Sequence, residues 1–169
     1  HVVIARDDAA GIEAAARRER QRIFAALDAD FLLTAHQQDD QAETLLLQLL
    51  RGAGPKGLAA MAELQSRPGW RAAQLRPLLG VTRAGLLDYA QSHGLTWVDD
   101  ESNRDIRYRR NALRRQVMPL LAAHFPGSGA TLARAAALQA DAADLLDDLA
   151  RIDAETAIAG ERLDCALLA

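Results

Sequence analysis

The amino-acid sequence predicts an α/β fold, with part of a parallel sheet followed by a helical arm. Short apolar runs that suit strands alternate with longer segments in which apolar residues recur at helical spacing. From residue 130 to residue 152 the pattern changes to one long stretch rich in alanine and leucine. Alternating strands and helices favour a parallel sheet, because parallel strands need a crossover connection that a helix usually supplies.

The first half of the chain contains two strand and helix pairs. Residues 2–5 and the run Phe31–Leu33 are short and apolar, as buried strands are. Residues 11–27 have apolar positions along one helical face, and the leucine-dense residues 42–50 predict a buried helix closed by a glycine loop.

The second half continues the alternation and then becomes helical. Thr82 is a suitable N-cap for a helix that ends at Gly94. The remaining expected elements are a helical stretch over residues 58–64, strands over 72–75 and 95–98, and helices over 111–125 and 130–152.

Composition limits the possible class of protein. The 169 residues are 50% hydrophobic and 25% charged, which is ordinary for a globular chain of one domain and part of a second. The single cysteine, Cys165, cannot form an internal disulfide or a zinc or cluster framework, so we expect a reducing cytoplasm. No apolar run approaches the roughly 20 residues of a membrane span, so no membrane partner is expected.

One imidazole and three carboxylates gather between the strand at residues 31–33 and the helix that follows: His36, Asp39, Asp40 and Glu43. Open α/β sheets bind ligands at this end of their strands. One interpretation needs no ligand, with Asp40 as an N-cap and Glu43 as its partner in a capping box. A second is a metal site with His36 and Asp40, four residues apart, where one histidine and carboxylates suit magnesium held through phosphates better than zinc. A third is an amine site, where carboxylates hold an ammonium and His36 takes its proton. Spacing does not choose between the last two.

A second charged segment lies near the middle of the chain. Six arginines and one aspartate between Arg104 and Arg115 give a local charge of +5, although the whole chain carries -3. Such a cluster can be a solvated surface held by salt bridges. Alternatively it contacts phosphates, since arginine offers a planar fork to phosphate oxygens and Tyr108 is placed to stack on a base.

Several spaced motifs closely resemble the bacterial tRNA(Ile)-lysidine synthases. The longest is residues 34–44, Thr-Ala-His-Gln-Gln-Asp-Asp-Gln-Ala-Glu-Thr, which is followed by Arg-Gly-Ala-Gly at 51–54 and Gly-Leu at 57–58. The other matching positions are residues 11–14, 16–17, 76–79, Asp99, 102–103, 110–111, Arg114 and 119–120.

The resemblance implies a fold and a reaction. The fold would be that of the PP-loop, or N-type ATP pyrophosphatase, group: a doubly wound parallel sheet of the adenine nucleotide alpha hydrolase type. With ATP and Mg²⁺, such enzymes adenylate the C2 carbonyl of the wobble cytidine of an isoleucine tRNA. The ε-amine of free lysine then displaces AMP and leaves lysidine.

The resemblance also implies roles for individual residues. His36 and Asp40 would be catalytic, acting on the lysine amine or on a magnesium ion bound by Asp40, with Asp39 and Glu43 in support. The implied substrate or nucleotide contacts are Arg51, Gly52, Gly54, Gly57 and Arg76, and the implied tRNA contacts are Arg110, Asn111 and Arg114.

Two departures from the family limit this expectation. The SGGxDS loop that grips pyrophosphate is not found in these 169 residues, and Gln37 stands where the family usually has a second histidine. We therefore expect a fragment that is inactive alone, with the C-terminal portion of a PP-loop domain at 1–103. An arginine-rich connector at 104–125 and a helical arm at 126–169, leading toward a missing tRNA-binding region, would follow.

Two other functions remain open on the sequence alone. A tRNA thiolase of the same group would act on a tRNA base in a related way, although a lone cysteine argues against sulfur or cluster chemistry. A non-catalytic RNA-binding or scaffold fragment is favoured by the missing loop.

Overall fold

The computed structural model describes residues 12–98, 100–159 and 162–163. The strand expected at residues 2–5 lies outside these described residues. The chain divides into two units, one formed by His1–His36 with Ala62–Leu79 and the other by Gln37–Met61 with Gly80–Ala169. Each unit is described by itself.

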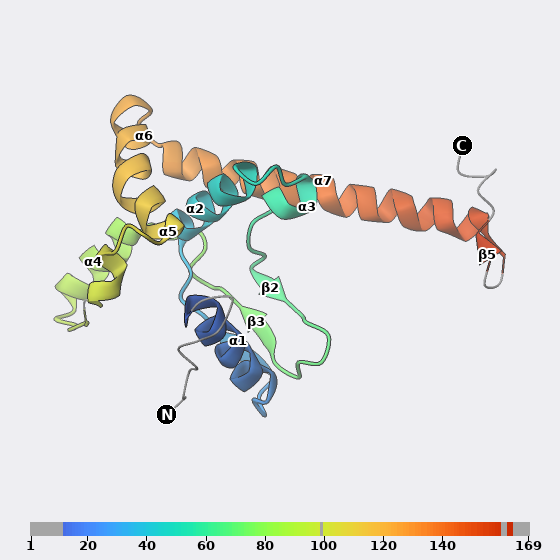
Figure 1. The fold of residues 1–169 in the computed structure, drawn as a ribbon, viewed down its shortest axis with the longest axis horizontal. Helices are drawn as coiled ribbons and strands as arrows, with labels where there is room; N and C mark the ends of the chain where they lie inside the picture. The colour runs from blue at the N-terminus through green and yellow to red at the C-terminus, as the bar shows by residue number, and fades with distance from the viewer. Residues whose placement is uncertain (1–11, 99, 160–161, 164–169) are drawn as a thin grey trace. The chain divides into compact units, whose positions relative to one another are not determined.

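The first unit carries a small sheet and one helix (Figure 1). The strand order is β1-β3-β2, with β1 parallel to β3 and β2 antiparallel to it. The parallel pair confirms the predicted crossover, and the antiparallel edge makes the described sheet mixed. The elements are α1 (Ile12–Ala25), β1 (Phe31–Leu33), β2 (Leu64–Gln65) and β3 (Ala73–Leu75).

Two predictions about strands β1 and β2 and the residues that lead into them are wrong. Residues 58–64 are not helical, because Leu58 ends a short helix, Ala60 has a φ of 55°, and Leu64 begins β2. The strand at Phe31–Leu33 exists but is not buried: Phe31 and Leu33 are 55% and 64% exposed.

Arg76 follows β3, as predicted, and its side chain connects β3 to the edge strand β2 and to the residues just before β2. Its guanidinium donates to the Ala62 carbonyl at 2.6 Å and to the side-chain oxygens of Gln74 at 2.8 Å and Gln65 at 3.1 Å. Burial, and then the charge of Arg67, lower the pKa of Arg76. An arginine nevertheless stays protonated at neutral pH, so Arg76 acts as a buried cation bound by uncharged oxygens.

The second unit is mostly helical, and α2 and α3 pack along α7 (Figure 1). The buried residues on α2 and α7 include Ala42, Ala136 and Ala143, whose small side chains let the helix backbones approach closely. The elements are α2 (Gln38–Leu49), α3 (Pro55–Leu58), α4 (Arg83–Ser92), η1 (Glu101–Arg104), α5 (Arg109–Ala112), η2 (Leu113–Val117), α6 (Met118–His124), α7 (Ser128–Ala157), β4 (Ile158–Ala159) and β5 (Arg162–Leu163).

The helix predicted after Thr82 is confirmed as α4. The Thr82 hydroxyl accepts from the backbone N–H of Gly85 at 3.1 Å, and Gly94 follows the helix with a φ of 60°. The strand predicted over residues 95–98 is wrong. These residues pair with no strand in the described part of the chain, and Val98 is 93% exposed.

The helix predicted over residues 111–125 is confirmed with one irregularity. Helical residues run from Arg109 to His124, and η2 within them is a π-helix. Pro119 lacks an N–H, and its ring clashes with the carbonyl four residues earlier, so an α-helical ladder cannot continue through it. The wider π turn accommodates the proline.

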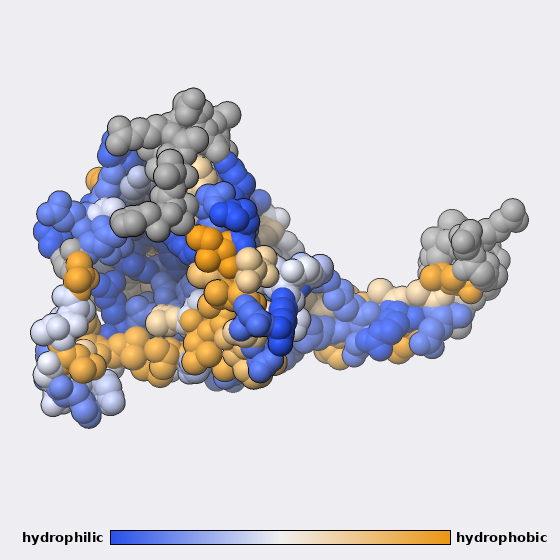
Figure 2. All heavy atoms as spheres, turned by 90° about the horizontal axis from the view of Figure 1, so that it is seen from below, coloured by the Kyte–Doolittle hydropathy of each residue, from blue (hydrophilic) through white to orange (hydrophobic). Residues whose placement is uncertain are grey.

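The arm expected over residues 130–152 is confirmed as α7, which is longer at both ends. Every residue from Asp144 to Asp153 is exposed. Hydrophilic and hydrophobic side chains lie side by side along this part of the helix (Figure 2). No helix in the described ranges is long and apolar enough to cross a membrane.

Candidate functional site

The acidic segment after β1 begins a helix rather than a turn. Gln38 is the first residue of α2, and the Asp40 carboxylate accepts from the backbone N–H of Gln37 at 3.1 Å. Asp40 is thus the third helical residue, and the expectation that it is the N-cap, with Glu43 as its capping partner, is wrong. Acidic residues in a first turn are favoured by the helix dipole, which explains their position but not their tertiary contacts.

Asp40 and Glu43 form a carboxylate–arginine cluster with Arg110 and Arg114. Arg110 donates to Glu43 at 2.9 Å and to Asp40 Oδ1 at 3.0 Å. Arg114 donates to both oxygens of Glu43, at 2.6 and 2.8 Å, and to Asp40 Oδ1 at 2.9 Å. Glu43 is only 1% exposed. Two carboxylates and two guanidiniums leave the cluster electrically neutral, as a buried set of charges must nearly be.

Helical spacing places the two carboxylates on one helical face and the two arginines on another. Asp40 and Glu43 are three positions apart on α2, and Arg110 and Arg114 are four positions apart on the α5 and η2 helix, so each pair shares one helical face. Hydrogen bonding to Glu43 raises the pKa of Arg114, and the nearby carboxylate charges add to this effect. Arg114 is therefore a permanently charged partner.

A cavity of about 320 Å³ lies beside this cluster. The Asp39 carboxylate at its edge accepts from the backbone N–H of Arg83 at 2.8 Å, which ties the start of α2 to the start of α4. Side chains of both charges and the first turn of α7 form the lining. The residues are Asp39, Glu43, Arg83, Arg114, Met118, Pro119, Ala122, Ser128 and Gly129.

His36 belongs to the first unit, whereas the three acidic residues belong to the second. Its Nδ1 lies 3.0 Å from the Thr34 hydroxyl oxygen, which also accepts from the Gln74 side chain at 3.2 Å. The Thr34 N–H donates to the Leu75 carbonyl at 2.9 Å, extending the β1 and β3 pairing. Sheet contacts therefore position the histidine at the end of β1.

The glycine loop has two local structural requirements. Gly52 has a φ of 72°, which is the left-handed region, and a Cβ at Gly57 would lie 2.7 Å from the Ala53 Cβ. Gly54 has a φ of -78° and open space around it, so its local structure would accept a side chain. Of the three predicted glycines, Gly54 is thus the one that the fold itself does not require.

Two further predicted site residues, Arg51 and Asn111, differ in their exposure and contacts. Arg51 is exposed beside an apolar pocket. Asn111 donates to the carbonyls of Ser102 and Asp105, both at 2.9 Å, and so holds the η1 loop against α5.

Asp40 fits a magnesium ion poorly in this arrangement. Oδ1 accepts from two guanidiniums and Oδ2 from a backbone N–H, so both oxygens already have donors. Among the residues that the structure describes, no group of three or more His, Cys, Asp or Glu side chains is arranged to hold a metal ion. We therefore derive no step through a protein-bound metal.

Sequence reasoning did not identify several residues around this site. Gln41 exchanges two hydrogen bonds with the backbone of Met61, at 2.7 and 2.9 Å, which fastens the end of the glycine loop to α2. Arg83, Ser128 and Gly129 line the cavity. The motif match at residues 34–44 includes Gln41 and was the available signal for it; the cavity-lining residues carried none.

Comparison with known proteins identifies a family and several named relatives. A family model described as PP-loop domain matches residues 2–121. A tRNA(Ile)-lysidine synthase from Azoarcus sp. is 51% identical over 154 residues, covering 90% of this chain and 34% of that protein. Proteins of the same name from Nitrosomonas europaea and Pseudomonas aeruginosa are 50% and 56% identical, covering 90% and 84% of this chain and 33% and 32% of theirs. The chain thus spans about a third of the length of these curated relatives.

A solved structure shares the fold at low sequence identity. The U34-tRNA thiolase NcsA from Methanococcus maripaludis, with its [4Fe-4S] cluster, aligns at a TM-score of 0.55 and 19% identity. The alignment covers 74% of this chain and 41% of that one. Together with the family match it confirms the predicted fold class. The chain therefore belongs to the PP-loop domain family.

Proposed function

We propose that this chain forms part of a tRNA(Ile)-lysidine synthase and contributes its amino-acid site. The observation that carries the proposal is the cavity beside Glu43, where the acidic residues of the matching motif lie on α2. About half of the residues are identical to those of relatives with that name over most of the chain, which supports the assignment.

The proposed reaction has two steps. The C2 carbonyl oxygen of the wobble cytidine attacks the α-phosphorus of ATP and releases pyrophosphate. The ε-amine of free lysine then attacks C2, a proton leaves the amine, and AMP departs with the oxygen. ATP enters with Mg²⁺ as its counterion, and the cytoplasm supplies ATP, tRNA and lysine together.

The charges around the cavity suit a free amino acid. Lysine carries two ammonium groups and one carboxylate. The lining contains the acidic residues Asp39 and Glu43 and the basic residues Arg83 and Arg114, and Asp40 lies beside Glu43, where both contact Arg114. The first turn of α7 also favours an anion through the helix dipole. A volume of about 320 Å³ lies at the small end of the range for ligand pockets.

The ion pairs suggest how an ammonium enters. Arg110 is more exposed than Arg114, at 39% against 25% for the side chains, and it makes one bond to each carboxylate where Arg114 grips Glu43 with two. Arg110 is therefore the partner that a substrate ammonium displaces from Asp40. Under this proposal Asp40 holds the amine, His36 accepts its proton, and Asp39 and Glu43 support the site. The implied tRNA contacts of Arg110, Asn111 and Arg114 remain a prediction.

The test uses the complete product of the gene with isoleucine tRNA, labelled lysine, ATP and Mg²⁺. Wild type should incorporate lysine. The His36→Ala and Asp40→Asn variants should each lose at least about 100-fold in rate, the low end for losing an acid or base group. Asp144→Asn is the matched control, because Asp144 is exposed on α7 and lines no described pocket.

Two readouts keep the result interpretable. Circular dichroism must show that each variant is folded at the assay temperature, and the KM for lysine should rise in Asp40→Asn. Wild-type rates in both folded variants would refute the site assignment. A complete gene product that binds isoleucine tRNA but incorporates no lysine would refute the enzyme and favour a non-catalytic RNA-binding protein.

A further inference from the structure

A second pocket, of about 320 Å³, lies at the far end of α2. Of its lining residues, only Arg51 is an implied substrate or nucleotide contact, and the two proposed reaction steps give the pocket no role. Leu47, one helical turn beyond Glu43, is part of its lining, so the pocket and the carboxylate–arginine cluster are neighbours on one helix. The full lining is Leu47, Leu50, Arg51, Arg109, Ala112, Leu113, Gln116 and Val117.

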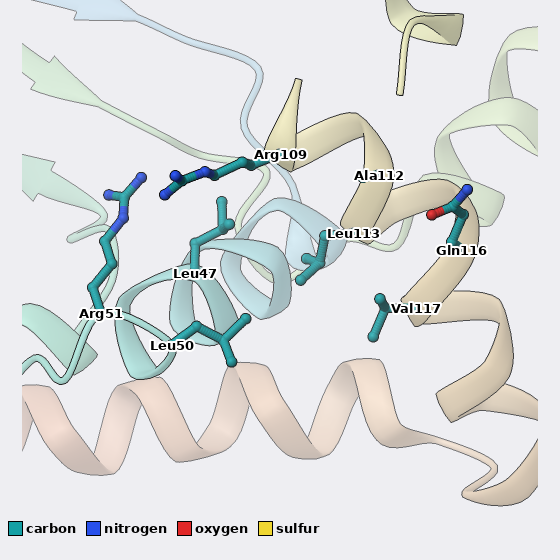
Figure 3. Close-up of a pocket in the computed structure, with 8 residues that line it drawn as sticks. All are labelled: Leu47, Leu50, Arg51, Arg109, Ala112, Leu113, Gln116 and Val117. Carbon is teal, nitrogen blue, oxygen red and sulfur yellow. The ribbon is translucent and has the colours of Figure 1, made fainter. Parts of the chain in front are cut away.

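The pocket has an apolar part and a cationic end. The leucines and Val117 provide aliphatic surface, and Leu50 is 76% exposed although it is large and apolar. Figure 3 shows Arg51 and Arg109 at the same end of the pocket, one from the loop after α2 and the other from the start of α5. A ligand that fits both parts has a planar or apolar body and an anionic group.

The two arginines differ from their neighbours in having no acidic partner. Arg110 and Arg114 are held by Asp40 and Glu43. Within the described part of the chain, neither Arg51 nor Arg109 forms an ion pair or side-chain hydrogen bond. Two guanidiniums that face the same space repel each other electrostatically. A phosphate between them would offset this repulsion and accept hydrogen bonds from both side chains.

We propose that this pocket binds one nucleotide of an RNA strand, with the base against the aliphatic surface and its phosphate between Arg51 and Arg109. The inference rests on the proposed function only in taking RNA as the partner. The neighbouring cluster would then hold the lysine that reacts with a nucleotide close by in the same strand. The pocket thus selects RNA that already presents an unpaired nucleotide beside the reacting one.

The experiment measures binding of fluorescently labelled isoleucine tRNA to the complete gene product by anisotropy at several salt concentrations. Arg51→Ala and Arg109→Ala should each weaken binding about tenfold, as expected for losing one charged hydrogen-bonding partner. Each should also reduce the slope of log affinity against log salt by about one. Arg115→Ala is the matched control, since Arg115 is an exposed arginine of the same helix outside the pocket, and it should change affinity less than about twofold.

A third variant separates the base from the phosphate. Val117→Trp should fill the apolar part, weakening binding while leaving the salt slope at its wild-type value, because no phosphate contact is lost. Titration with free AMP and CMP distinguishes the source of the nucleotide. Free nucleotide that binds with the same arginine dependence, but does not compete with tRNA, would replace the RNA site by a mononucleotide site and overturn the proposal.

The outcomes are distinct from those of the lysine assay. If the protein makes lysidine but Arg51→Ala and Arg109→Ala bind tRNA as Arg115→Ala does, the pocket inference fails alone. If the arginine dependence is found and no lysidine forms, the proposed enzyme fails and the pocket stands.

Discussion

At the scale of single residues, the most constrained side chain is that of Glu43. A carboxylate that is 1% exposed is stable as an anion only if donors surround it, and Arg110 and Arg114 supply three N–H groups within 3 Å. Replacing such a network by apolar groups can be neutral, but removing one member leaves the other charges unpaired. Its individual members are therefore expected to be sensitive to mutation.

We predict that Arg114→Ala lowers the free energy of unfolding by about 2–3 kcal/mol, the upper range for hydrogen bonds to a charged group. Arg110 still contacts Glu43 in this variant, which prevents a larger loss. Urea unfolding followed by circular dichroism measures the change, and Arg115→Ala should stay within about 0.5 kcal/mol of wild type. Equal midpoints for the two variants would mean that the ion pairs contribute no net stability.

At the scale of elements, the turn after α2 shows which glycines the backbone needs. Gly52 is in the left-handed region, where a Cβ is strained. Gly57 sits on α3 with Ala53 against it, so a side chain there would push α3 from its place beside α7. Gly54 is under neither constraint, and any need for a glycine there would come from a bound molecule.

We predict that Gly52→Ala lowers stability by about 1–2 kcal/mol, the cost of a left-handed residue with a Cβ, and that Gly54→Ala changes stability by less than about 0.5 kcal/mol. Thermal unfolding of both variants checks this. The lysine assay adds a second result: a stable Gly54→Ala variant that loses activity would show close approach of substrate to this backbone. If Gly54→Ala is instead the less stable variant, the assigned backbone geometry is wrong.

At the scale of the whole molecule, burial is unevenly distributed. The part of α7 near Ala136 and Ala143 packs in the second unit, whereas the stretch from Asp144 to Asp153 is exposed on every side. The Lys56 to Asp147 ion pair, at 2.6 Å, joins α3 to this stretch, but both partners are exposed and such pairs add little stability. Isolated helical turns are marginal in water without packing.

We predict that backbone amides of residues 147–153 exchange with deuterium at least about ten times faster than those of residues 133–143, because local opening is easier where few apolar contacts exist. Hydrogen exchange followed by mass spectrometry on the 169-residue chain measures both segments. Equal rates would mean that another part of the chain covers the exposed segment in solution.

Much of the fold could be predicted from local pattern. The strand at Phe31–Leu33, the helix capped by Thr82 and the long α7 were predicted because a few neighbouring residues determine each of them. The strand expected at residues 2–5 lies outside the described residues. The strand expected at residues 95–98 is absent from the described structure, because an apolar run becomes a strand only where another strand pairs with it. The predicted domain boundaries remain a prediction.

The sequence by itself determined the α/β class, the family resemblance and the spacing that puts Asp40 with Glu43, and Arg110 with Arg114, on shared helical faces. Only the tertiary structure decided that these two faces meet. Their sequence separation is about 70 residues, and a charge pattern in one helix does not specify which distant helix will neutralise it. The same physical reason applies to Arg51 and Arg109, whose lack of an acidic partner in the described structure depends on where the intervening helices place them.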